Sequence, residues 1–214
     1  MGLAAVFWDN DGVLVDTEEL YYDATRTVLA GAGCDLTTEL YRELSLRHGR
    51  SAFDLVRDVV GEDGVEILRQ QRNALYATRL ASGVAALDGV AETLDALHGR
   101  VAMAVVTSCN PEHFALIHRG TGLLPYFDFV LTNRDYAHTK PHPASYLAAL
   151  ARAGVPAEEC IAIEDSERGL AAARAAGLRC IVVPRGLTRG GDFSGAYRVV
   201  EQTRDLRPIL ADLL

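Results

Sequence analysis

One stretch near the start of the chain decides the fold: Val6-Phe7-Trp8-Asp9-Asn10-Asp11-Gly12-Val13-Leu14-Val15-Asp16-Thr17-Glu18. The apolar run from Leu3 to Trp8 is too short for a helix and is bounded by turn-forming residues, which predicts a buried strand. Two carboxylates, Asp9 and Asp11, follow this strand directly. We therefore expect the chemistry of the protein at the carboxyl end of this strand.

Like charges in such a position need compensation. Each pair of carboxylates about 5.5 Å apart costs about 3 kcal/mol at an effective dielectric constant of about 20. A hard divalent cation removes this cost, and an oxygen-only ligand set favours Mg²⁺. An Asp in such a site can also act as a nucleophile and form an aspartyl-phosphate, while Gly12 suits a turn that approaches a ligand closely. Considered alone, Asp-Asn-Asp-Gly fits an ordinary surface turn equally well.

The composition narrows the class of protein. The chain has 214 residues, almost half of them apolar, and a net charge of -8. This acidity argues against nucleic acid or an anionic membrane as partner and leaves small anionic metabolites, bound through a cation or a local basic pocket. Asp9 and Asp11 interrupt the N-terminal apolar run, and the four cysteines show no C-x-x-C spacing. We expect a cytoplasmic protein with reduced cysteines, as a monomer or weak homodimer.

The segment from Glu18 to Gly83 is predicted to be entirely helical. Apolar residues at helical spacing and flanking glycines indicate helices over residues 18–31, about 38–48, 53–60 and 65–80. Three arginines on the last of these, Arg69, Arg72 and Arg79, are interpreted as a solvent-exposed face. The predicted domains are therefore a helical insertion over residues 18–83 and a core formed by residues 1–17 and 84–214.

The core alternates strands with helices. Further strands are predicted at Val101–Val106, Phe129–Leu131, Cys160–Ile163 and Cys180–Val183, with a short one near residues 198–200. This alternation indicates an α/β fold, a Rossmann-like doubly wound parallel sheet with five main strands. Ligands bind at the carboxyl ends of such strands. The polar residues that follow them should therefore meet at one edge: Asp9, Asp11, Thr107, Ser108, Glu164 and Asp165.

These residue types suit phosphoryl transfer, in which catalysis is mostly positioning and charge neutralisation. Asp9 is the candidate nucleophile, and Asp11 is the candidate acid and base. Thr107, Ser108 and Lys140 are candidate phosphoryl ligands, and Asn110 with Pro111 suits the start of a helix whose N–H groups favour an anion. Mg²⁺ is expected at Asp9 and Asp165, with Glu164 assisting. Arg50 could contact the distal part of a substrate or lie in a solvated turn.

Together the four motifs resemble those of the haloacid dehalogenase superfamily. They are Asp9-x-Asp11-Gly12-Val13-Leu14-x-Asp16-Thr17, the strand ending in Thr107-Ser108, Lys140-Pro141-x-Pro143, and Glu164-Asp165-Ser166. The chain is most similar to the phosphatase and β-phosphoglucomutase-like branch. The resemblance implies the strand order 5-4-1-2-3, a metal contact from the main-chain carbonyl of Asp11, and a helical cap that closes over the substrate. The helical segment 18–83 matches that cap in position.

The sequence departs from the family pattern at three positions. Asn10 and Ala144 stand where an apolar residue and an acid are common, and Tyr21 falls where mutases carry a histidine. The expected activity is a Mg²⁺-dependent phosphatase acting on a small phosphate monoester, a sugar phosphate or a phosphoglycolate-like acid. Three alternatives stay open. They are a phosphosugar mutase, which Tyr21 disfavours; a 2-haloacid dehalogenase, which Asp11 disfavours because such enzymes lack an acid two residues after the nucleophile; and a non-catalytic phosphoacceptor.

Overall fold

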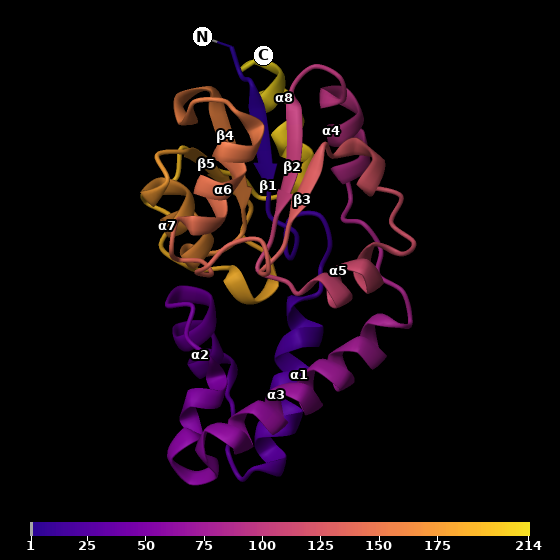
Figure 1. Ribbon diagram of the computed structural model, residues 1–214. Helices are drawn as coiled ribbons and strands as arrows, with labels where there is room; N and C mark the ends of the chain where they lie inside the picture. Colours follow the sequence, from indigo (N-terminus) through magenta and orange to yellow (C-terminus); the bar gives the residue numbers. More distant parts are fainter. Residues whose placement is uncertain (1) are drawn as a thin grey trace.

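The computed structural model describes residues 2–214 and contains a parallel sheet whose strands all point toward a separate group of helices (Figure 1). The strands are β1 Ala5–Trp8, β2 Ala102–Val106, β3 Phe129–Leu131, β4 Cys160–Glu164, β5 Arg179–Val182 and β6 Arg198–Val199. The helices are α1 Glu18–Gly31, α2 Thr38–Tyr41, α3 Arg57–Leu80, α4 Val90–Leu97, α5 Pro111–His118, α6 Ala144–Ala153, α7 Glu167–Ala175 and α8 Leu206–Ala211. The sheet order is β3-β2-β1-β4-β5-β6, which confirms the expected order and adds β6 at one edge.

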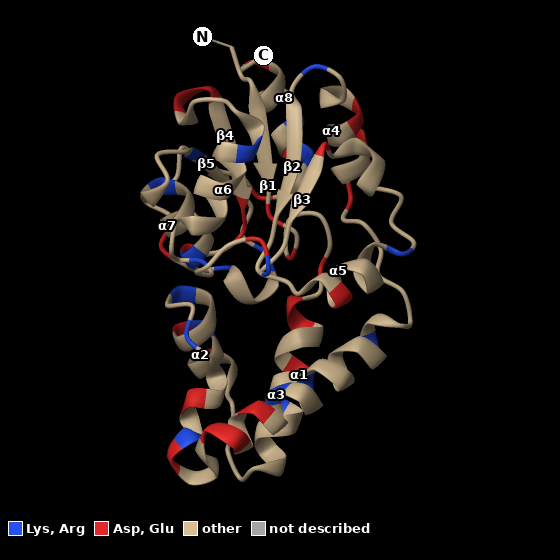
Figure 2. Ribbon diagram, in the orientation of Figure 1, with Lys and Arg blue, Asp and Glu red and all other residues tan. Residues whose placement is uncertain are grey.

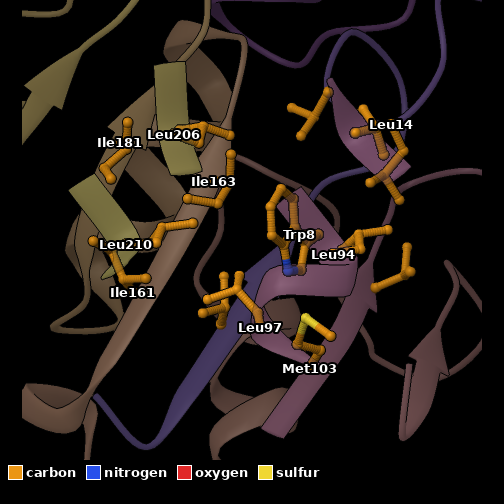
Figure 3. Close-up of a cluster of buried hydrophobic side chains, with 14 of the residues drawn as sticks. Trp8, Leu14, Leu94, Leu97, Met103, Ile161, Ile163, Ile181, Leu206 and Leu210 are labelled. Carbon is orange, nitrogen blue, oxygen red and sulfur yellow. The ribbon is translucent and has the colours of Figure 1, made fainter. Parts of the chain in front are cut away.

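The sheet is buried on both faces because side chains alternate along each strand. In β1, Val6 and Trp8 point to the face that α4 and α8 cover, where Trp8 packs against Leu94 and other apolar side chains (Figure 3). Ala5 and Phe7 point to the opposite face, which α6 and α7 cover. The continuous apolar run that predicted β1 is thus explained by burial on both sides.

Parallel pairing brings the ends of the central strands to one edge. Trp8 is in register with Val105 of β2 and with Ile163 of β4, so Asp9, Thr107 and Glu164 follow at nearly the same height. The ladder continues one residue past β1, where the Asp9 N–H donates to the Ile163 carbonyl at 2.9 Å. The edge position expected from the sequence is therefore a consequence of the sheet register.

The Asp-Asn-Asp-Gly segment does form a turn, and that turn is largely buried. The carbonyl of Asn10 accepts hydrogen bonds from the N–H groups of Val13, Leu14 and Val15. Gly12 has φ +79°, a conformation that favours glycine, and an added Cβ would overlap the Asp165 carboxylate. The surface-turn alternative is wrong, because Asp9 is 8% exposed and Asn10 is 0% exposed.

The segment from Glu18 to Leu80 contains helices throughout, as predicted, with differences in detail. α2 has four residues and continues as a π-helix over Arg42–Arg47. The predicted helix 53–60 is a 3-10 turn, Ala52–Leu55, followed by the first turn of α3, and Gly61 interrupts α3 with φ 70° and ψ 176°. The division of the chain into core and cap domains stays a prediction. Among residues 2–214, no helix has both the length and the apolarity needed to cross a membrane.

Two boundaries in the core also differ from the sequence prediction. β4 includes Glu164, so this residue is the last of the strand and not the first residue after it. The apolar pattern predicts a helix over about Gly169 to Ala176. α7 begins two residues earlier, at Glu167, because the Ser166 side chain accepts a hydrogen bond from the Gly169 N–H and caps the helix. The polar motif after β4 is thus held between a strand end and a helix start.

Replacing Trp8 tests the packing of the sheet on α4 and α8. Trp8 is 0% exposed, and its indole N–H has no hydrogen-bond partner among the described residues. We expect Trp8→Ala to reduce the free energy of unfolding by about 3–5 kcal/mol because of the cavity it leaves. Trp8→Phe should cost less, about 1–2 kcal/mol, because it keeps most of the packing and removes a buried unpaired donor. Urea denaturation measures both; equal small losses would contradict burial of Trp8.

Candidate active site

The site is organised around a buried ammonium group. Lys140 is 3% exposed, and its Nζ donates to Asp9 Oδ1 and to the Val106 carbonyl, both at 2.8 Å. It also forms an ion pair with Glu164 Oε1 at 2.7 Å. Burial disfavours the charged ammonium, but the carboxylates of Asp9 and Glu164 outweigh this and raise the pKa of Lys140. Lys140 is therefore a fixed positive charge that connects the ends of β1, β2 and β4.

Glu164 is held by two groups at once. Its Oε1 accepts a hydrogen bond from the Tyr146 hydroxyl at 2.6 Å, in addition to the contact with Lys140. Burial is the main cause that raises the pKa of the Glu164 carboxyl, and Lys140 opposes that effect. An added Cβ at Gly169 would overlap the Glu164 carboxyl group, so the start of α7 packs directly against it. Glu164 thus fixes Lys140, whatever its role toward a metal.

Three carboxylates come together in a way that suits a divalent cation. Asp9, Glu164 and Asp165 each offer an oxygen, and these oxygens all lie within 4.8 Å of one another. Burial, followed by the charges of Asp9 and Glu164, raises the pKa of Asp165 well above its usual range. Lys140 offsets only part of the charge of these three carboxylates, and a buried, oxygen-only cluster that keeps negative charge matches the ligand preference of Mg²⁺. The described residues therefore fit the predicted metal.

Asp11 stands apart from this cluster. Its Oδ1 accepts a hydrogen bond from the Thr17 hydroxyl, and its Oδ2 accepts one from the Asn10 amide at 3.3 Å. Burial and the neighbouring Asp9 raise the pKa of Asp11 to about 6, against the lowering effect of these two donors. A carboxyl group with a pKa near neutrality is suited to give and take a proton. The metal contact implied for the main-chain carbonyl of Asp11 stays a prediction.

A small cavity of about 20 Å³, here the inner cavity, lies beside these charged groups. Asp9, Ser108, Lys140, Asp165 and Arg168 are among the residues that line it. The Ser108 hydroxyl is buried, and within the described part of the chain it has no hydrogen-bond partner. Thr107, 1% exposed, also lines the cavity, and its Oγ1 accepts a hydrogen bond from the Cys109 N–H at 3.0 Å. A free hydroxyl beside an ammonium is suited to an anion such as a phosphoryl group.

A larger cavity of about 340 Å³, here the outer cavity, lies between the strand ends and the helices α1 and α3. It is lined by Arg50, Arg69, Arg72 and Arg168 but by only two acidic residues, Asp11 and Glu18. Figure 2 shows the acidic ribbon segments that gather at the lower ends of the central strands, above the helices. The four arginines therefore make the lining of the outer cavity locally positive, although the whole chain has a net charge of -8.

The two predicted substrate residues occupy this outer cavity differently. Asn110 lines the cavity, but its Oδ1 caps α5 by accepting from the His113 N–H at 2.7 Å. Its amide N–H groups are therefore the part that remains for a ligand. Arg50 is exposed, lines the cavity, and follows the π-helix. Their roles in substrate binding stay predictions.

The interpretation of the α3 arginines as a purely solvent-exposed face is wrong. The Arg72 guanidinium carbon lies 4.2 Å from the Tyr21 ring centroid and 5.5 Å from that of Phe53, and Arg72 and Arg69 line the outer cavity. Arg79 instead donates to the Leu20 carbonyl at 3.1 Å. Periodicity within one helix could not reveal this, because the aromatic partners come from other segments.

Two further groups were not identified from the sequence. Arg168 lines both cavities from the first turn of α7, three residues after Asp165, a spacing that places both at the same helix start. Tyr146 lies three residues after Lys140-Pro141-His142-Pro143, in the first turn of α6, and was not among the candidate site residues. The apolar pattern after Lys140 indicates the helix that carries Tyr146. It does not indicate that the Tyr146 hydroxyl contacts Glu164 on β4.

Neutralising Asp11 tests the crowding of acids in the metal-free protein. Because its pKa lies near 6 when folded and near 3.8 when unfolded, the folded protein holds the extra proton in this window, and stability falls as the pH rises through it. We expect Asp11→Asn to raise the free energy of unfolding by about 1–3 kcal/mol at pH 7.5 in EDTA. The gain should shrink as the pH falls toward 4.5. Comparing the two proteins at each pH cancels the contribution of histidine titration, which is common to both. A gain that does not depend on pH would contradict the raised pKa.

The comparisons with known proteins agree with this geometry. The sequence pattern of the haloacid dehalogenase-like hydrolases matches residues 3–177. Protein CbbY of Rhodobacter capsulatus is 35% identical, over 92% of each chain. The phosphorylated carbohydrates phosphatase of Thermotoga maritima is 31% identical, over 84% of each chain.

A solved structure shows the same arrangement of elements. It is a crystal structure of a CbbY variant from Rhodobacter sphaeroides in complex with xylulose-1,5-bisphosphate, 28% identical, with a TM-score of 0.81 over 95% of this chain and 96% of that one. The family pattern, the relatives and the shared fold therefore lead to one conclusion. The chain belongs to the haloacid dehalogenase-like hydrolase family, in its phosphatase and β-phosphoglucomutase-like branch, and is a phosphoric monoester hydrolase.

Proposed function

We propose that this enzyme is a Mg²⁺-dependent phosphatase that hydrolyses a small phosphorylated metabolite through an aspartyl-phosphate on Asp9. The observation that carries the proposal is the contact of Lys140 Nζ with Asp9 Oδ1 at 2.8 Å, beside the inner cavity. The Ser108 hydroxyl, which has no hydrogen-bond partner within residues 2–214, lines the same cavity. Lys140 restrains Asp9 Oδ1, which leaves the other carboxylate oxygen of Asp9 available to attack phosphorus. The proposed location is the cytoplasm, as expected from the sequence.

In the first step, an oxygen of Asp9 attacks phosphorus, forming an O–P bond while the bond from phosphorus to the leaving oxygen breaks. Lys140, Thr107 and Ser108 bind the phosphoryl oxygens and neutralise their charge. Protonated Asp11 gives its proton to the leaving oxygen, so the product departs as an alcohol. The raised pKa of Asp11, about 6, supports this role because a useful fraction is protonated near neutral pH.

In the second step, Asp11, now a carboxylate, takes a proton from water as that water attacks phosphorus. The Asp9–phosphorus bond breaks, which releases inorganic phosphate and restores both carboxyl groups to their starting forms. When bound, Mg²⁺ would be held by Asp9 and Asp165, with Glu164 in reach, and would offset the negative charge of carboxylates and phosphate. The same acid and base serve both steps, which disfavours a long-lived phosphoacceptor.

We further propose that the substrate carries a second anionic group, which the outer cavity receives. Arg72 is held against the rings of Tyr21 and Phe53, so little side-chain entropy is lost when it binds an anion. Arg50 and Arg69 line the same cavity. The bisphosphate bound by the CbbY variant supports this substrate class. The candidate substrates are phosphorylated sugars and phosphoglycolate-like acids. A mutase remains the second candidate, and Tyr21 in the cavity wall disfavours it.

The nucleophile is tested by Asp9→Asn with a generic aryl phosphate. The amide cannot form the acyl-phosphate, so we expect phosphate release to fall by at least about 10³-fold while the circular dichroism spectrum is unchanged. Asp95→Asn, an exposed substitution on α4, is the matched control and should retain full activity. Full turnover by Asp9→Asn would show that another group attacks phosphorus.

The second anionic group is tested by Arg72→Ala with a sugar bisphosphate and the matching sugar monophosphate. Loss of one charge-assisted contact should raise KM for the bisphosphate by about 10-fold and leave the monophosphate within about two-fold. Arg26→Ala, exposed on α1, serves as the control. A KM that rises equally for both compounds would mean that Arg72 supports only the fold of the cavity wall.

A further inference from the structure

A buried chain of hydrogen bonds leads from α5 to Asp11. His118 Nδ1 is 2.9 Å from the Thr121 hydroxyl, and His118 Nε2 is 2.7 Å from Asn10 Oδ1. The Asn10 amide then donates to Asp11 Oδ2 at 3.3 Å. Asn10 is 0% exposed and His118 is 4% exposed, so both need protein partners for their polar atoms.

The direction of this chain follows from its two ends. At one end, Asp11 Oδ2 can only accept while it is ionised, so the Asn10 NH₂ group faces it and Asn10 Oδ1 faces His118. His118 must then donate from Nε2 and accept at Nδ1. At the other end, the Leu123 N–H donates to the Thr121 Oγ1 at 3.3 Å, which leaves the hydroxyl proton for His118 Nδ1. In this orientation each contact along the chain pairs one donor with one acceptor.

The charge state of His118 agrees with that orientation. Burial lowers its pKa to about 4, so the imidazole is neutral at neutral pH and offers one donor and one acceptor. Its ring also packs on Phe114, with centroids 4.5 Å apart, which restrains rotation. Flipping Asn10 would set Oδ1 against the Asp11 carboxylate and its NH₂ against the Nε2–H.

We propose that His118 and Asn10 are positioning residues that hold the Asp11 carboxyl group toward the reacting centre. Asn10 touches Asp11 directly, and His118 acts only by fixing the orientation of the Asn10 amide. The proposal rests on the assignment of Asp11 as the acid and base of the proposed function. The sequence motif singles out the same residue, because Asn10 stands where this family commonly has an apolar residue.

A misplaced general acid slows reactions with poor leaving groups more than those with good ones. Dinitrophenolate leaves phosphorus with little need of a proton, whereas phenolate needs one. The readout is kcat/KM for phenyl phosphate and for dinitrophenyl phosphate, which reports the first phosphoryl transfer. A purely structural defect reduces both values together, so the ratio distinguishes positioning from folding.

We expect Asn10→Leu and His118→Phe each to lower kcat/KM for phenyl phosphate by about 10-fold and for dinitrophenyl phosphate by at most about two-fold. The double variant Asn10→Leu/His118→Phe should lose no more than Asn10→Leu alone, because His118 acts through Asn10. It also replaces both buried partners by apolar groups, which keeps it folded if a single variant leaves one polar group unpaired. His118→Gln, which can still donate to Asn10, should restore most of the activity toward phenyl phosphate.

Equal losses for both compounds, or unchanged ratios in folded variants, would overturn the positioning role. Failure of the unsubstituted enzyme to hydrolyse either aryl phosphate in the presence of Mg²⁺ would instead overturn the proposed function. Thermal unfolding of each variant, measured in the same buffer, confirms that the compared proteins are folded.

Discussion

The structure depends on one buried ammonium group. Lys140 Nζ meets the carboxylates of Asp9 and Glu164 and the carbonyl of Val106, and so joins three neighbouring strands at one edge. Removing one partner from such a buried ion pair typically costs about 3–5 kcal/mol, because the remaining charge stays buried. The same contact that holds the edge together also restrains the candidate nucleophile. Stability and chemistry are therefore tied to a single side chain.

That charge does not balance the site. Asp9, Asp11, Glu164 and Asp165 supply four carboxylates, and the pKa values of the last two and of Asp11 are raised, chiefly by burial. The remaining negative charge is unfavourable because the carboxylates repel one another, and binding of a cation would relieve this repulsion. The basic lining of the outer cavity then attracts an anionic substrate that the chain as a whole would repel. Sequence composition alone describes only the average charge.

The sequence predicted what depends on local pattern. Apolar runs followed by polar residues located the strands and their shared edge, so Asp9, Thr107 and Glu164 were expected to meet before any contact was known. Contacts between distant segments were not visible. The rings that hold Arg72 come from α1 and from the 3-10 turn before α3, and His118 is 108 residues from Asn10. Helical periodicity predicts which face is apolar, but not which polar side chain on another element completes it.

The central claim is that phosphorus becomes bonded to Asp9, and one measurement tests it most directly. Enzyme mixed with excess aryl phosphate and Mg²⁺ is quenched in acid within milliseconds, digested, and analysed by mass spectrometry. The account predicts one added phosphoryl group on the peptide that contains Asp9, which disappears once the substrate is exhausted. Turnover without any phosphoryl group on that peptide, or with the group on another residue, would contradict it.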